Sequence, residues 1–325
     1  VIVVEPDGAK VDAARRRWDE AGVYGIDIVA HVGDPAAPAL PPYLASRIHV
    51  ADSLSAGATE HTKIVEAVFG ALRPYGGTAS LPLEADRLRK LVERAGLEGA
   101  QVASLGSGRS TLVRMGPLPG AADWTHQYAD PSNSVVSRDQ RVKAPLGLLW
   151  FGGPPNDEVL PRHGHGPSPQ VAGGRLLIEG RNMLRALDAY TGRLLWQKDL
   201  PDLGEFHAHT GHQPGAGEIG GNYVSLEDRV YVVYGDTLLD LDAATGDLKR
   251  RFKVKAQGDS AQPSWGFLAA HDDLLIATST PVAPAQSEGI KKPELPPGVI
   301  ALIEPRASWK YLAGSDPEGD WMAPD

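Results

Sequence analysis

The 325-residue chain contains no cysteine. Disulfides, iron–sulfur clusters, thiolate zinc sites and c-type haem attachment are therefore excluded within it. It also contains no run of about eighteen apolar residues, so we expect no membrane-spanning helix. Basic residues are fewer than acidic ones, 32 against 41, and they form no basic stripe. Nucleic acid is therefore not an expected partner.

The first residues carry no initiator methionine and no signal sequence, and Val1 opens directly on the strand-like stretch VIVVEPD. Secretory signals have a charged start followed by an apolar run and a small-residue cleavage site. We interpret the chain as a fragment or processed product of a longer protein.

Strand-like and helix-like segments alternate over residues 1–118. Apolar residues at helical spacing predict helices over 7–22, 58–74 and 84–96, with short apolar strands between them. Two strand-like segments, 100–105 and 111–118, follow one another directly at the end. This pattern predicts an α/β domain with an antiparallel end.

An internal repeat begins further along the chain. Arg175–Trp196 matches Arg229–Arg250 without a gap at an offset of 54, and a partial third copy from Phe267 matches Tyr223 at an offset of 44. Repeats of this length are typical of β-propellers. The sequence therefore predicts all-β propeller blades over residues 119–307.

The repeated motif has the spacing Asp-x-x-Thr-Gly. Asp188 and Asp242 are placed to accept backbone N–H bonds at a turn, and Gly192 supplies the positive φ that the turn needs. Trp196 is expected to pack between adjacent blades. Because both repeats carry the aspartate, we assign it to architecture rather than catalysis.

The blade pattern stops before the end of the chain. Residues Trp309–Trp321 do not fit it, and we interpret 308–325 as the start of an inserted domain, with a jelly-roll as one candidate. The remaining length accommodates only part of a ring. We expect the rest of the same polypeptide to complete the propeller.

The stretches ALDAYTGRLLW and DLDAATGDLKR resemble the repeats of quinoprotein propellers, the family of pyrroloquinoline-quinone (PQQ) alcohol dehydrogenases and its non-catalytic relatives in outer-membrane assembly. The resemblance implies a periplasmic or exported protein with a small-molecule or carbohydrate ligand. One implied function is a PQQ- or metal-dependent oxidoreductase acting on an alcohol or sugar. The alternative is a non-catalytic binding scaffold of the bacterial envelope.

Residues 1–118 resemble the later part of a class I S-adenosylmethionine (SAM) methyltransferase, a Rossmann-like fold. By this resemblance Glu5, which ends VIVVE, would hold the ribose hydroxyls, and Asp34 in HVGDP would meet the adenine amine. Leu72–Gly77 is similar to the turn before the family's fifth strand. The glycine-rich loop that precedes Glu5 in the family is missing, so SAM is not the expected cofactor of this fragment. A SAM-dependent methyltransferase is the third candidate function.

The order of the two parts, a methyltransferase-like part followed by propeller blades, resembles that of large exported planctomycete-type proteins.

Histidines cluster in two loops before predicted inner blade strands. They are His163 and His165 in the first loop and His207, His209 and His212 in the second. Alternating histidines on an extended segment share a face, which suits zinc, copper or iron with Glu205 or Glu218 as a carboxylate ligand. His207 and His209 are also candidate general bases. The alternative is that these histidines hydrogen-bond the backbone at the mouth of the channel.

Asn222 and Trp265 occupy near-equivalent positions at the starts of two inner strands. Asn222 could face a cofactor and Trp265 could stack on one; the alternative for both is closure between blades. The polar stretch Asp123–Ser134 is interpreted as a linker packed on the propeller, or as part of its channel surface.

Overall fold

A computed structural model describes residues 1–278 apart from 39, 52–57, 209–213, 220–221 and 254–264. The predicted insert at 308–325, and the part of the predicted blade region beyond 278, lie outside the described residues. None of the helices in the described part is both long enough and apolar enough to cross a membrane.

The first part of the chain alternates strands and helices as the sequence predicts. Its elements are β1 (Ile2–Glu5), α1 (Gly8–Glu20), β2 (Val29–Val32), β3 (Arg47–His49), α2 (Ala58–Ala71), β4 (Gly77–Leu81), α3 (Ala85–Arg94), β5 (Ala100–Gly106) and β6 (Arg109–Arg114). Asp7 caps α1 by accepting the backbone N–H of Ala9 at 2.9 Å.

Two sheets form this α/β part. Strands β1 and β2 pair in parallel, and the other four follow the order β3-β4-β6-β5. In the second sheet β3 and β4 are parallel, whereas β6 lies antiparallel between β4 and β5. The predicted antiparallel end is therefore present. Buried side chains of α2 and α3, among them Val65 and Leu88, share one core with Leu81 and Leu112 of the sheet.

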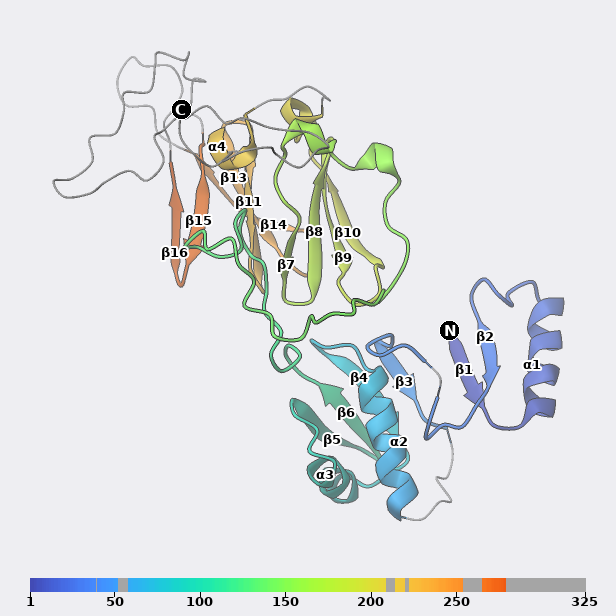
Figure 1. Cartoon of the computed structure of the whole chain (residues 1–325). Helices are drawn as coiled ribbons and strands as arrows, with labels where there is room; N and C mark the ends of the chain where they lie inside the picture. Colours follow the sequence, from blue (N-terminus) through green and yellow to red (C-terminus); the bar gives the residue numbers. More distant parts are fainter. Residues whose placement is uncertain (39, 52–57, 209–213, 220–221, 254–264, 279–325) are drawn as a thin grey trace, which may run out of the picture. The chain divides into compact units, whose positions relative to one another are not determined.

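Two four-stranded antiparallel sheets follow (Figure 1), and both have their strands in the same order. Blade 1 consists of β7 (Gln170–Ala172), β8 (Arg175–Gly180), β9 (Met183–Asp188) and β10 (Leu194–Asp199). Blade 2 consists of β11 (Tyr223–Ser225), β12 (Arg229–Tyr234), β13 (Thr237–Asp242) and β14 (Leu248–Lys253). Each sheet runs in chain order from its inner to its outer strand. These sheets are propeller blades.

The partial third repeat forms a hairpin of β15 (Leu268–His271) and β16 (Leu274–Ala277). Its two strands correspond to β11 and β12 of blade 2. Leu268 packs with Val224 and Leu238 of blade 2, so the hairpin extends the array of blades by one step.

The Asp-x-x-Thr-Gly turns connect the third and fourth strands of both blades. Asp188 accepts the N–H of Tyr190 at 2.9 Å, and Asp242 accepts that of Ala244 at 2.8 Å. Gly192 and Gly246 have φ values of +69° and +76°, which L side chains rarely adopt. The predicted turn chemistry is confirmed in both copies.

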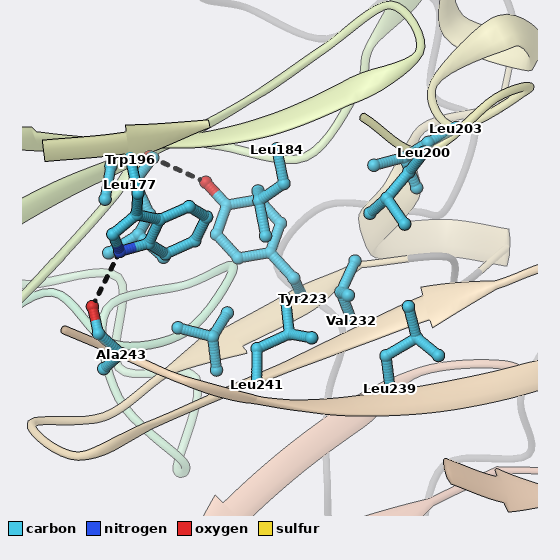
Figure 2. Packing of buried hydrophobic residues seen from close by; sticks show 12 residues of the cluster. Leu177, Leu184, Trp196, Leu200, Leu203, Tyr223, Val232, Leu239, Leu241 and Ala243 are labelled. Atoms are coloured by element: carbon cyan, nitrogen blue, oxygen red, sulfur yellow. Dashed lines mark hydrogen bonds between the residues drawn. The ribbon is translucent and has the colours of Figure 1, made fainter. Parts of the chain in front are cut away.

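Trp196 on the outer strand of blade 1 docks on the turn of blade 2. Its indole donates to the carbonyl oxygen of Ala243 at 2.9 Å, and a Cβ on Gly246 would lie only 2.7 Å from the ring. Figure 2 shows the indole nitrogen pointing at that carbonyl. The prediction that Trp196 packs between blades is confirmed.

The core shared by blades 1 and 2 contains one buried tyrosine. The Tyr223 ring comes from β11, and its hydroxyl donates to the carbonyl oxygen of Leu177 on β8 at 2.9 Å (Figure 2). Leucines of β9 and β13, including Leu184 and Leu241, surround it. A buried phenol needs such an acceptor, because an unbonded hydroxyl in an apolar core costs about 1–3 kcal/mol.

Candidate functional site

The loops that lead from an outer strand to the next inner strand lie at one end of the blades. Because adjacent strands alternate in direction, the Asp-x-x-Thr-Gly turns lie at the opposite end. Three short helical turns belong to the loop end, namely η2 (Arg162–Gly164), η3 (Glu205–His207) and α4 (Ala216–Ile219). The candidate site is the group of histidines on these loops.

The structure brings the two histidine loops together. A Cβ on Gly166 would lie 3.3 Å from that of His207, and the carbonyl oxygen of His165 accepts the N–H of Ala216 at 2.9 Å. The rings of His163 and His165 are exposed, whereas that of His207 is buried. The first loop thus contacts the second loop at His207 and α4 at Ala216.

His207 is the histidine whose chemistry the structure defines best. Its Nδ1 lies 2.8 Å from the carbonyl oxygen of Gly164. Since a carbonyl only accepts, Nδ1 carries the proton, and Nε2 is left with the lone pair that a metal or an acid could use. Burial lowers the pKa of His207, more than the bond to Gly164 raises it. His207 is therefore held neutral, which is the form that binds metals.

The carboxylates predicted beside these histidines have different surroundings. Glu205 is held by Arg181 through two bonds of 2.7 and 2.9 Å, while Glu218 is exposed on α4. His209 and His212 lie outside the described residues. In the part of the chain that the structure describes, no three histidine, aspartate or glutamate side chains are grouped as a metal site requires. The metal assignment stays a prediction.

Asn222 joins blade 2 to the third repeat. Its amide donates to the carbonyl oxygen of Leu268 at 3.1 Å and accepts the N–H of the same residue at 3.0 Å. Gln170 joins blades 1 and 2 in the same way, through the carbonyl oxygen of Tyr223 and the N–H of Ser225. The bonds of Asn222 close blade 2 against the third repeat, which is the alternative to cofactor binding that the sequence leaves open. Cofactor binding by Asn222 stays a prediction.

Trp265 is half-buried against blade 2. Its indole donates to the carbonyl oxygen of Asp236, in the turn before β13, at 3.0 Å. Its ring packs against the core shared by blade 2 and the hairpin, which contains Leu238 and Leu268. The contact again corresponds to closure between blades, and stacking on a cofactor stays a prediction.

Residues 124–126 run across the inner strands of all three repeats. Trp124 exchanges two backbone hydrogen bonds of 2.8 Å with Val171 of β7, and the carbonyl of Thr125 accepts the N–H of Ser225 of β11 at 3.0 Å. The ring of His126 then accepts the N–H of Ala270 of β15 at 2.9 Å. We call residues 124–126 the stitch. The stitch belongs to Asp123–Ser134, which the sequence analysis interprets as a linker packed on the propeller. Its contacts with the inner strands agree with that interpretation.

Glu5 and Asp34 lie at the carboxyl ends of the neighbouring parallel strands β1 and β2. Glu5 accepts the N–H of Asp7 at 3.1 Å, and Asp34 accepts that of Ala36 at 2.8 Å. Both acids thus order the loop that follows their strand. Their assignment to SAM is untested by these contacts and stays a prediction.

Trp150 is a structural residue that the sequence reasoning missed. Its indole donates to the carbonyl oxygen of Ala189 at 3.0 Å, and a Cβ on Gly192 would overlap its ring. The signal was present in the sequence, since GLLW at 147–150 echoes RLLW at 193–196. It went unseen because no Asp-x-x-Thr-Gly turn precedes the first copy.

A profile of the family described as outer membrane protein assembly factor BamB matches residues 109–279. The chain belongs to this family. No curated protein matches it. Among solved structures it is similar to a quinohemoprotein alcohol dehydrogenase from Comamonas testosteroni, at 20% identity over 47% of this chain and 22% of that one, with a TM-score of 0.33.

Two further solved structures are similar over shorter spans. BamB from Moraxella catarrhalis is 21% identical over 33% of this chain and 27% of its own, with a TM-score of 0.22. A europium-containing methanol dehydrogenase is 19% identical over 28% of this chain and 16% of its own, also with a TM-score of 0.22. The chain thus spans about a quarter or less of the length of each of these three proteins.

Proposed function

We propose that the blades act as a binding scaffold of the bacterial envelope, in the assembly of outer-membrane proteins for which the family is named. The observation that carries the proposal is the stitch, which is hydrogen-bonded to the inner strands of all three described repeats. Backbone groups of residues 124 and 125 hold β7 and β11, and the His126 ring holds β15, so one segment links the inner edges of the three repeats.

The described inner strands do not fit PQQ. This quinone is a planar tricarboxylate, and it needs cationic or donor groups that are free to face it. The amides of Gln170 and Asn222 are bonded to backbone, and β7, β11 and β15 contain no lysine or arginine. We therefore assign no quinone chemistry to these strands.

The scaffold proposal is tested by deleting the gene in its source bacterium and measuring folded outer-membrane barrels by their heat-modifiable gel mobility. We expect fewer folded barrels, restored by the wild-type gene and by His207→Gln. Gly246→Asp should fail to restore them, because it strains the turn and displaces Trp196. Unchanged barrel levels after deletion, or failure of His207→Gln alone, would argue against a scaffold.

Metal binding at the histidine loops is the second candidate. The neutral His207, with its Nε2 lone pair and the neighbouring His165, favours it. A metal held there would supply Lewis-acid or redox chemistry toward an alcohol or sugar, and His207 would be one ligand. Zinc, copper and iron are measured by mass spectrometry after dialysis. A stoichiometric metal that His207→Gln removes would support this candidate, and metal-free protein would exclude it.

SAM binding by the α/β part is the third candidate, favoured by the two acids at adjacent strand ends. Calorimetric titration with SAM tests it directly. We expect no heat from wild-type protein, because Glu5 and Asp34 already accept backbone N–H groups of the loops that follow them. Saturable heat that Glu5→Gln and Asp34→Asn abolish would instead establish this activity.

A further inference from the structure

The turns of blades 1 and 2 neutralise their aspartates in different ways. In blade 2 the Nζ of Lys249 lies 2.8 Å from Oδ2 of Asp242. At the offset of 54, the residue of blade 1 equivalent to Lys249 is Leu195, which carries no charge. Asp188 instead faces Arg73 of the α/β part, whose Nη1 lies 3.2 Å from its Oδ2. The counter-ion of blade 1 thus comes from outside the blade.

This ion pair is also the more buried of the two. The side chains of Asp188 and Arg73 are 1% and 15% exposed, against 26% and 40% for Asp242 and Lys249. Within the described residues, Oδ2 of Asp188 has no hydrogen-bond partner, so Arg73 is the charge that compensates it. A buried carboxylate that loses its compensating charge is strongly destabilising. The turn of blade 1 therefore depends on a side chain of the α/β part.

A second difference between the repeats makes room for Tyr75 of the α/β part. Blade 1 has Gly174 at the position that Asp228 holds in blade 2 and Asp272 in the third repeat. A Cβ on Gly174 would lie only 2.6 Å from the Tyr75 ring. The backbone of a repeat does not itself require glycine here, because Asp272 adopts a positive φ of +50°. Gly174 therefore serves the contact with Tyr75.

A third difference lies within the turn of blade 1. Tyr190 stands where blade 2 has Ala244. The Tyr190 ring meets that of Tyr43 of the α/β part edge-on, with 5.6 Å between the ring centroids. The Arg114 guanidinium lies over the same Tyr43 ring at 5.0 Å. Such edge-on rings and cations over rings attract each other. Blade 1 thus departs from blade 2 at positions 174, 190 and 195, where its surroundings include the α/β part.

We propose that the turn end of blade 1, the end that carries its Asp-x-x-Thr-Gly turn, is a dedicated docking surface for the α/β part. Tyr43, Arg73 and Tyr75 bind it. Arg73 and Tyr75 belong to Leu72–Gly77, the stretch that resembles a methyltransferase turn, and they give that stretch a docking role. The proposal is independent of whether the propeller is a scaffold or an enzyme.

Docking of this kind does not join the two hydrophobic cores. Leu88 belongs to the core of the α/β part and Leu184 to that of the blades, and the contacts between Arg73, Tyr75 and blade 1 lie outside both. The α/β part and the blades are therefore held together by an ion pair and aromatic rings, which single substitutions can remove while each core stays intact.

The distance between two spin labels tests the proposal in the intact chain, which contains no cysteine of its own. The labels are attached at Leu105→Cys in β5 and Asp199→Cys in β10, because both positions are exposed. We expect one narrow distance distribution. Arg73→Gln and Gly174→Asp should each widen it by about twofold or more, because domains without a firm interface move relative to each other.

Lys249→Gln is the matched control. It breaks the equivalent ion pair inside blade 2 and should leave the distribution unchanged. Widening by Arg73→Gln and Gly174→Asp alone supports the proposal. A distribution that is already broad without these substitutions overturns it, as does one that Lys249→Gln widens equally. Tyr75→Ala keeps the test decisive if Gly174→Asp fails to fold. It removes the ring from the α/β side, leaves blade 1 unaltered, and should widen the distribution as well.

Discussion

At the scale of single residues, the blades are held by a pair formed from a tryptophan and a left-handed glycine. Gly246 serves two purposes: it adopts a φ of +76°, and it leaves room for the Trp196 ring 2.7 Å from where a Cβ would lie. Gly192 does the same for Trp150. The neighbouring aspartates fix the turn through backbone N–H groups. The Asp-x-x-Thr-Gly motif could suggest a catalytic aspartate beside a threonine. In this structure it instead forms the turn on which the tryptophan of the preceding blade docks.

Gly246→Ala should destabilise the protein more than Gly235→Ala. Both glycines have positive φ, but a Cβ on Gly235 would meet nothing within 4 Å, whereas one on Gly246 would strike the Trp196 ring. Gly235→Ala is expected to cost about 1 kcal/mol of unfolding free energy from backbone strain alone. Gly246→Ala adds about 1–3 kcal/mol of overpacking. Urea denaturation compares the two variants, and equal losses would refute the docking role.

Acid should weaken the fold through the buried histidines His126 and His207. Burial lowers the pKa of both His126 and His207, so the folded state resists protonation that the unfolded chain accepts below about pH 6.5. The unfolded state then binds more protons, and stability falls as the pH falls through that window. Urea denaturation at pH 7.5 and 5.5 should show a smaller loss for His207→Gln than for wild type. Replacing His271, whose side chain is exposed, should leave the loss unchanged.

At the scale of elements, strands and turns could be predicted because their signals are local. Each helix and strand predicted for residues 1–118 has a counterpart in the structure. The 54-residue offset likewise aligns β8, β9 and β10 of blade 1 with β12, β13 and β14 of blade 2. The stretch of the stitch was interpreted as a linker packed on the propeller, but its partners could not be predicted. Val171, Ser225 and Ala270 are far along the chain, and hydrogen bonds to their backbone groups leave no mark on composition. For the same reason the partner of Asn222, a polar residue directly before β11, could not be predicted.

Cutting the stitch at His126 should loosen the third repeat selectively. His126→Ala removes the acceptor of the Ala270 N–H and leaves that buried donor unpaired, at a cost of about 1–3 kcal/mol. Exchange of the amides in β15 and β16 should accelerate by about five- to a hundredfold. Those of β12 and β13, which pair within their own blade, should change little. Uniform acceleration across both blades would mean that the stitch supports the whole array.

At the scale of the molecule, the described residues contain separate hydrophobic cores. Leu88 and Leu112 belong to that of the α/β part, while Leu184 and Leu241 belong to that of blades 1 and 2. The change in sequence texture near residues 117–124 corresponds to the passage from one to the other. The domain boundary predicted near residue 118 stays a prediction, and it implies that each core unfolds as a unit of its own.

Calorimetry should resolve two unfolding transitions that respond to different substitutions. Leu88→Ala deletes a fully buried side chain of the α/β core. It should lower the free energy of unfolding of residues 1–118 alone, by about 2–5 kcal/mol. Leu241→Ala deletes a fully buried side chain of the core of the blades and should lower the free energy of unfolding of the blades alone. Helical circular dichroism assigns the transitions, because α1, α2 and α3 all lie within residues 1–118 whereas blades 1 and 2 consist of strands. A single transition lowered equally by both substitutions would show that the two parts unfold as one unit, and the boundary near residue 118 would then mark a change of fold within one cooperative domain.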